Sequence, residues 1–134
     1  EDMLKSLHIN YRITGFIPHR RALELLNNVD ILVLPSRRTL NTESIVPLKV
    51  IEAWALGKPV VVTRHKIFVE MGLKDMKHLV YCEPNSHNVA EVILRLINNK
   101  ELRYRLSEVG PKLAEKFSYD KIAKTLISTI KRST

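Results

Sequence analysis

Residues 31–62 of the chain read ILVLPSRRTLNTESIVPLKVIEAWALGKPVVV, and this stretch decides the class of fold. It opens on a continuous apolar run, residues 31–34, which is typical of a strand buried on both faces of a sheet. After a polar loop over residues 36–46, residues 47–57 begin with proline and end with glycine, a pattern that predicts a helix. A second apolar run, residues 60–62, predicts the next buried strand. Strand, helix and strand in this order predict a parallel sheet with a right-handed crossover.

The same alternation of strands and helices continues on both sides of this stretch. Ile9, Tyr11 and Ile13 alternate with polar residues and predict a strand, and residues 79–81 predict another. Apolar residues at helical spacing predict helices over 22–29, 68–71, 89–97, 102–109 and 123–130, and Gly110-Pro111 is expected to interrupt the fourth of these. The chain is therefore expected to form an α/β fold, with a Rossmann-like parallel sheet of about four strands flanked by helices.

The composition indicates one globular domain with an anionic partner. The chain has 134 residues, of which 45% are hydrophobic and 27% charged, and its net charge is +8. Aromatic residues are only 6%, and no motif for base contacts is present, so nucleic acid is a weak candidate. Cys82 is the single cysteine and no apolar run approaches the ~20 residues of a membrane span, so we expect a cytoplasmic protein.

Ligands of open α/β sheets bind beyond the carboxyl ends of the strands, so we expect the site in residues 14–19, 35–52 and 63–70. The helix that follows the polar loop offers free amides and a positive dipole end to a diphosphate, with Lys49 as a further contact. Glu52 lies among apolar neighbours in this helix, which we expect to be largely buried, and a buried carboxylate needs partners. Two ribose hydroxyls of a nucleotide would satisfy it, and an ion pair with Lys49 is the alternative.

These motifs resemble the signature of the family-4, or group 1, glycosyltransferases of the GT-B fold. That signature joins a Pro-Ser strand end, an acidic loop and an "EAMA-G-PVV" unit, which Pro35-Ser36, Glu43 and residues 52–61 (EAWALGKPVV) match here. Residues 47–49 (PLK) are similar to the "SPLK" lead-in of one branch of the family. Outside the signature, similar motifs occur at 15–18 (GFIP), 28–31 (NVDI) and 117–119 (FSY), so the resemblance runs from about Ile9 to the last helix.

The resemblance implies that residues 1–134 form the C-terminal, donor-binding half of a retaining glycosyltransferase. The upstream unit with the family's phosphate-binding Arg and Lys, and the N-terminal acceptor domain, are then expected outside this chain. The parent would transfer a sugar from a UDP-, GDP- or ADP-sugar to a glycan or lipid-linked acceptor without a bound metal, and the chain alone would not turn over. Lys121, Lys124, Lys131 and Arg132 could bring the parent to an anionic membrane at its inner face, although a solvated basic helix is the alternative.

The resemblance assigns roles to individual residues. Glu52 matches the second signature glutamate, which holds the ribose. Glu43 is the candidate for the first glutamate, near the donor sugar, but eight residues separate it from Glu52 where the family has seven, and Ser44 occupies the expected place. The amides of Ser44, Ile45 and Val46 are candidates for binding the diphosphate or sugar, with core packing as the alternative for the last two.

Four further residues lie near the expected site, and three of them have two possible roles. Phe16 could wall the base or belong to the core. Lys49 could contact the departing diphosphate or pair with Glu52. The Ser36 hydroxyl is expected to cap the next loop. His65 lies where the family often has a Gly-rich turn, and we expect a solvated loop histidine rather than an acid–base group.

Two other classes of function share parts of this pattern. A non-catalytic nucleotide-binding module would have the same fold without needing the residues on the sugar side. A basic nucleic-acid-binding domain would bind random duplex or single strands with a steep dependence on salt.

Overall fold

A parallel sheet forms the centre of the structure, a computed structural model that describes residues 9–133, with the backbone alone for residues 126 and 129–133. The strands are β1 (Leu32–Leu34), β2 (Val60–Thr63) and β3 (Val80–Cys82), in the order β1-β2-β3. Both pairings are parallel. The predicted α/β class is confirmed.

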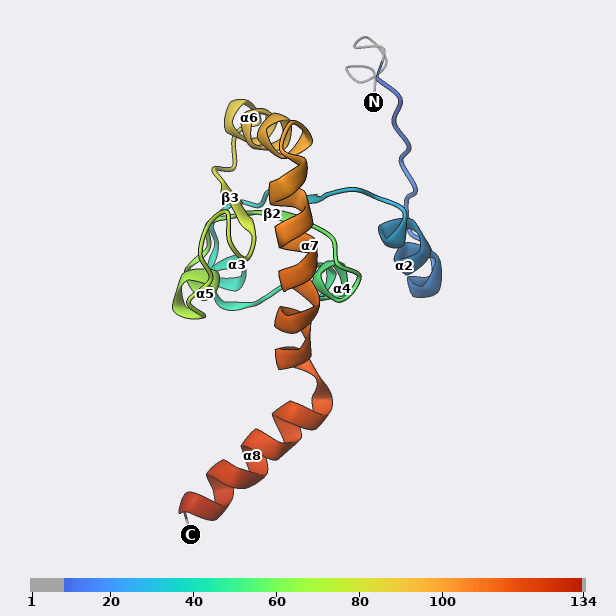
Figure 1. Cartoon of the computed structure of the whole chain (residues 1–134). Coiled ribbons are helices and arrows are strands. Elements are labelled where there is room, and N and C mark those ends of the chain that lie inside the picture. Colours follow the sequence, from blue (N-terminus) through green and yellow to red (C-terminus); the bar gives the residue numbers. More distant parts are fainter. Residues whose placement is uncertain (1–8, 134) are drawn as a thin grey trace.

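Helices cover both faces of this sheet (Figure 1). The short helices α3 (Leu40–Ser44) and α5 (Lys66–Glu70) lie on one face together with α4 (Leu48–Ala55), and α6 (Ser86–Ile97) lies on the other. The remaining elements are α2 (His19–Asn27), α7 (Lys100–Ala114), the 3₁₀ turn η1 (Glu115–Phe117) and α8 (Tyr119–Ser133). The expected helix order is therefore present.

Successive side chains of β2 point into two apolar clusters, one on each face of the sheet. Val60 and Val62 pack with Trp54 of α4 in the first cluster. Val61 packs with Leu96 of α6 in the second. All four residues of β2 are buried, as the continuous apolar run predicts for the central strand of a parallel sheet.

Helix α7 joins the two clusters and runs without a break through Gly110 and Pro111, so the expected interruption is wrong. Leu102 belongs to the second cluster and Leu113 to the first, so both ends of the helix are anchored. Gly110 lies against the backbone of Trp54, where a side chain would not fit. Pro111 is exposed, and the cost of its missing N–H is offset by this packing on either side.

The strand predicted from Ile9, Tyr11 and Ile13 is absent, so the described part of the chain has three strands rather than about four. Ile9 is 53% exposed and Ile13 64% exposed, and this segment extends away from the sheet (Figure 1). Alternating residues form a strand only where a sheet edge offers backbone partners, and none of the described strands lies beside them.

The polar loop after β1 contains a helix that the sequence pattern did not predict. Thr39 begins α3 with a capping box, in which its Oγ1 accepts from the Thr42 amide and its own amide donates to Thr42 Oγ1. Two threonines that bond each other's amides can nucleate a short helix with no buried residue, which apolar periodicity cannot reveal.

Candidate functional site

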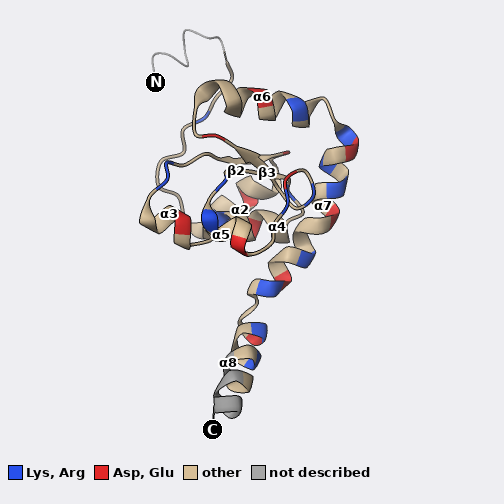
Figure 2. Ribbon diagram, turned by 90° about the vertical axis from the view of Figure 1, so that its left-hand side faces the viewer, with Lys and Arg blue, Asp and Glu red and all other residues tan. Residues whose placement is uncertain are grey.

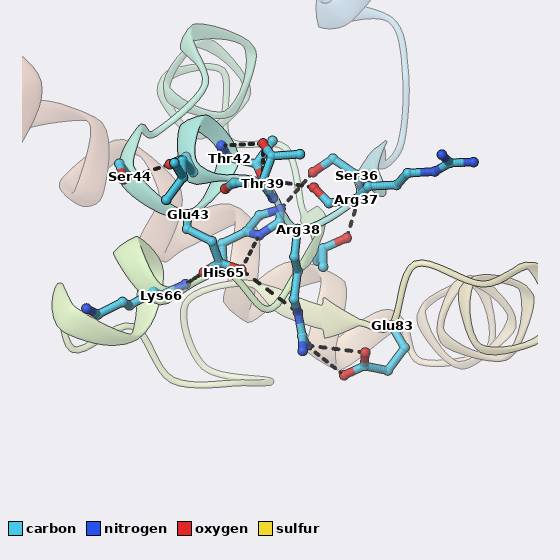
Figure 3. A network of polar contacts seen from close by, with 12 residues as sticks. Ser36, Arg37, Arg38, Thr39, Thr42, Glu43, Ser44, His65, Lys66 and Glu83 are labelled. Carbon is cyan, nitrogen blue, oxygen red and sulfur yellow. Dashed lines mark hydrogen bonds and ion pairs between the residues drawn. The ribbon is translucent and has the colours of Figure 1, made fainter.

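The loops that follow β1 and β2 are tied together at the carboxyl end of the sheet (Figure 3). The Ser36 amide donates to Thr63 Oγ1 at 2.9 Å. The Ser36 Oγ lies 2.7 Å from His65 Nε2. The Ser36 hydroxyl therefore contacts the loop after β2. It does not cap the loop after β1, where Thr39 provides the cap.

His65 is a buried residue at the centre of this network, and the expectation of a solvated histidine is wrong. It is 3% exposed, and its amide donates to the Thr63 carbonyl at 2.8 Å. Its Nδ1 lies 3.3 Å from Glu43 Oε1, so both ring nitrogens have partners. A histidine beside a polar loop can be buried here because those partners replace water.

Glu43, at the end of α3, reaches across to the loop after β2. Its Oε2 accepts the Lys66 amide at 2.5 Å, and its Oε1 faces His65 and, at 4.0 Å, Arg38 Nε. The Lys66 amide is the largest of several influences that hold the pKa of the Glu43 carboxyl below its ordinary value of 4.5, with burial opposing them and His65 and Arg38 assisting. The side chain is therefore a carboxylate at neutral pH.

Arg38 connects this network to the loop after β3. Its Nη2 lies 3.3 Å from both carboxylate oxygens of Glu83. Because both side chains are half exposed, this pair adds at most about 1 kcal/mol. The Arg38–Glu83 pair matters for geometry, because it links the loop after β3 to the loops after β1 and β2.

Glu52 lies on α4 with a side chain that is only 17% exposed. Its Oε1 is 2.5 Å from Nε2 of His19, in the first turn of α2. Lys49 is exposed and forms no ion pair within residues 9–133, so the alternative of a Lys49–Glu52 pair is wrong. In the same part of the chain, no hydrogen bond or ion pair engages Oε2 of Glu52.

Comparison with known proteins identifies the family. A family model described as "Glycosyl transferases group 1" matches residues 1–113. The chain belongs to the group 1 glycosyltransferases. It is also similar to a protein of Methanocaldococcus jannaschii described as an uncharacterized glycosyltransferase, with 27% identity over 139 residues, 90% of this chain and 40% of that protein. The chain thus spans less than half the length of this relative.

In this glycosyltransferase chain the other predicted site residues lie at or near the surface. Phe16 is fully exposed, so it is not a core residue. Ile45 is 60% exposed, whereas Val46 packs on the first apolar cluster. Ser44 ends α3, and its Oγ donates to the Leu40 carbonyl.

Helix α4 is buried on one side only, contrary to the expectation of a largely buried helix. Val50, Ala53 and Trp54 are buried, whereas Leu48 is 62% exposed and Leu56, at the C-terminal cap, 36% exposed. The exposed side of the helix start, which includes Lys49, is consequently open to a ligand.

Sequence reasoning missed two histidines as partners of the signature glutamates. His19 follows the loop 14–18 and His65 follows β2, so both fall in segments where the site was expected. Their position at the carboxyl end of the sheet was the available signal. The spacing of residues along the chain does not indicate which carboxylate each histidine contacts.

Among residues 9–133, no three His, Cys, Asp or Glu side chains are arranged to hold a metal ion. Within the same range, none of the helices combines the length and apolar character that crossing a bilayer requires. The side chains of Lys131 and Arg132, two of the four basic residues considered for membrane contact, lie outside the description.

Proposed function

We propose that this chain binds the nucleotide-sugar donor of a retaining, family-4 glycosyltransferase of the GT-B fold. The acceptor, a glycan or a lipid-linked glycan, would bind to an N-terminal domain of the full-length enzyme. The observation that carries the proposal is the largely buried carboxylate of Glu52, which has one oxygen engaged by His19 and the other without a partner in the described part of the chain.

A carboxylate in this position needs hydrogen-bond donors, because removing a charged oxygen from water without compensation is unfavourable. The two hydroxyls of a ribose are donors of this kind. His19 can stay bound to Oε1 while the ribose engages Oε2, so the histidine would orient the carboxylate toward the nucleotide.

The start of α4 is suited to the diphosphate of the donor. The helix begins after Pro47 with no side-chain cap, so its first amides are unpaired and carry the positive end of the helix dipole. Lys49 adds a cation that no carboxylate neutralises in the described part of the chain. These groups, without a metal, would stabilise the charge that develops on the departing nucleoside diphosphate.

The sugar of the donor would lie toward Glu43. The low pKa of this carboxyl keeps it charged, and the amides of Ser44, Ile45 and Val46 follow it on the same segment. In this proposal Glu43 contributes to the sugar side of the site and Phe16 to the wall around the base.

Calorimetric titration of the 134-residue chain tests the donor site. UDP, GDP, ADP and their sugar conjugates are titrated into the parent, Glu52→Ala and Glu43→Ala. One nucleotide is expected to bind selectively, and Glu52→Ala should weaken it by about 1.5–3 kcal/mol, the value of hydrogen bonds to a charged group. Glu43→Ala should weaken the sugar conjugate and leave the bare diphosphate unchanged.

Glu91→Ala is the matched control, because Glu91 is an exposed carboxylate on α6 that pairs, in the described part of the chain, only with its helical neighbour Arg95. It should bind as the parent does. Equal affinities for the sugar conjugate and the bare diphosphate would favour a non-catalytic nucleotide-binding module. Unchanged binding in Glu52→Ala would overturn the donor-site proposal.

A further inference from the structure

A cavity of about 270 Å³ opens beside Ser36. The loop after β1 supplies Pro35, Ser36 and Arg37. Pro84, Asn85 and the start of α6 with Ser86 and Val89 supply the other side, so the lining is both polar and apolar. The loops after β1 and β3 therefore enclose it, at the carboxyl end of the sheet where ligands of such folds bind.

A chain of hydrogen bonds sets the direction of the Ser36 hydroxyl. Because Glu43 is ionised, its Oε1 can only accept, so the proton of a neutral His65 must be on Nδ1. Nε2 is then an acceptor and takes the hydroxyl proton of Ser36 at 2.7 Å. Only the lone pairs of the Ser36 Oγ remain for a ligand in the cavity.

We propose that Glu43 and His65 orient Ser36 so that its Oγ accepts a hydrogen bond from a sugar hydroxyl of the donor in this cavity. Ser36 is then a ligand contact, and His65 is a positioning residue that acts through it. This inference rests on the proposed function and adds a residue that contacts the sugar of the donor.

The orientation of the Ser36 oxygen favours a hydroxyl-bearing group. A fully ionised phosphate has only acceptor oxygens, and these would face the lone pairs of Ser36. A sugar hydroxyl both donates and accepts, so it can donate to the Ser36 Oγ.

The tautomer of His65 tests the positioning role directly. Nitrogen-15 NMR of the imidazole, at a pH where it is neutral, should show the proton of His65 on Nδ1 in the parent. In Glu43→Ala the Nδ1 partner is lost, so the proton is expected to move at least partly to Nε2. A proton on Nε2 in the parent, or no change in Glu43→Ala, would overturn the role of His65.

Calorimetry tests the sugar contact. Ser36→Ala should weaken the nucleotide sugar by about two- to ten-fold, the effect of one neutral hydrogen bond, and leave the bare nucleoside diphosphate unchanged. His65→Asn keeps a nitrogen near the Nδ1 position and loses Nε2, so it should produce a similar sugar-specific loss. The double variant should be no weaker than either single variant, since both remove the same contact.

Ser107→Ala is the control, because the Ser107 Oγ donates to the Tyr104 carbonyl within α7. It should leave the sugar preference intact. A full sugar preference in Ser36→Ala would overturn the sugar contact. Absence of any nucleotide binding by the parent would contradict the proposed function and with it the sugar contact, whereas the His65 tautomer would still confirm or overturn the positioning role.

Discussion

The bond between the Glu43 carboxylate and the Lys66 amide connects two residues that are 23 positions apart. The pKa of Glu43 is lowered chiefly by this amide, so the folded protein binds a proton to this carboxyl less readily than the unfolded chain does. The stabilisation that the ionised Glu43 carboxyl gives to the folded protein is therefore complete above the ordinary pKa of 4.5. It is lost as the pH falls through the lowered pKa of the folded state.

Glu43→Gln is expected to lower the free energy of unfolding at neutral pH and to have less effect at acidic pH. The amide oxygen of Gln can still accept from Lys66 but carries no charge at any pH. Urea unfolding of both proteins at a series of pH values from 7 to well below 4.5 measures the difference. Glu70→Gln is the control, because it removes one negative charge from an exposed carboxylate on α5. A difference that stays constant with pH would contradict the linkage.

At the scale of elements, the close approach of α4 and α7 joins the signature helix to the core. A Cβ atom added to Gly110 would lie 2.9 Å from the Trp54 carbonyl oxygen and 3.2 Å from its Cα. Both contacts are with backbone, so no side-chain rotation can relieve them. The spacing of the two helices depends on this glycine.

Gly110→Ala is expected to destabilise the protein by about 1–3 kcal/mol through overpacking against α4. In an unobstructed helix the same change would stabilise by about 1 kcal/mol, so the sign of the effect is diagnostic. Urea unfolding at neutral pH measures it. Lys112→Ala, at an exposed position of the same helix, should change the free energy of unfolding little; a stabilising Gly110→Ala would show that the helices can separate at low cost.

At the scale of the whole molecule, α8 extends away from the body that holds the site (Figure 1). Tyr119, Ile122 and Ile127 are 90%, 44% and 54% exposed, and the Lys121–Glu115 pair is an exposed ion pair. Acidic and basic residues are interspersed along α7, so the net positive charge does not form one continuous stripe there (Figure 2). The stability of the body should therefore depend little on α8.

A chain that ends at Ser118 is expected to unfold cooperatively, with a free energy of unfolding within about 1 kcal/mol of the parent, the most that an exposed ion pair contributes. Thermal and urea unfolding followed by circular dichroism test this. A chain that ends at Asn98 is the contrast, because it loses the buried leucines of α7 and should not fold. Loss of folding in the chain that ends at Ser118 would show that α8 packs on the body in solution.

Much of the architecture follows from local pattern. The apolar runs at 31–34 and 60–62 and the helical spacing in α6 place these elements correctly, because burial on one or both faces imposes a period that is visible along the chain. The signature around Glu43 and Glu52 likewise indicated the glycosyltransferase family, which the family match confirms.

The partners of the signature glutamates were decided only in three dimensions. Glu52 meets His19 across 33 positions, and Glu43 meets His65 across 22. Spacing along the chain carries no information about such pairs, because they form only when the sheet brings different loops to one edge. The same reason explains the unbroken α7, where contact between Gly110 and Trp54 outweighs the local preference of proline, and the missing first strand, which finds no sheet edge beside it.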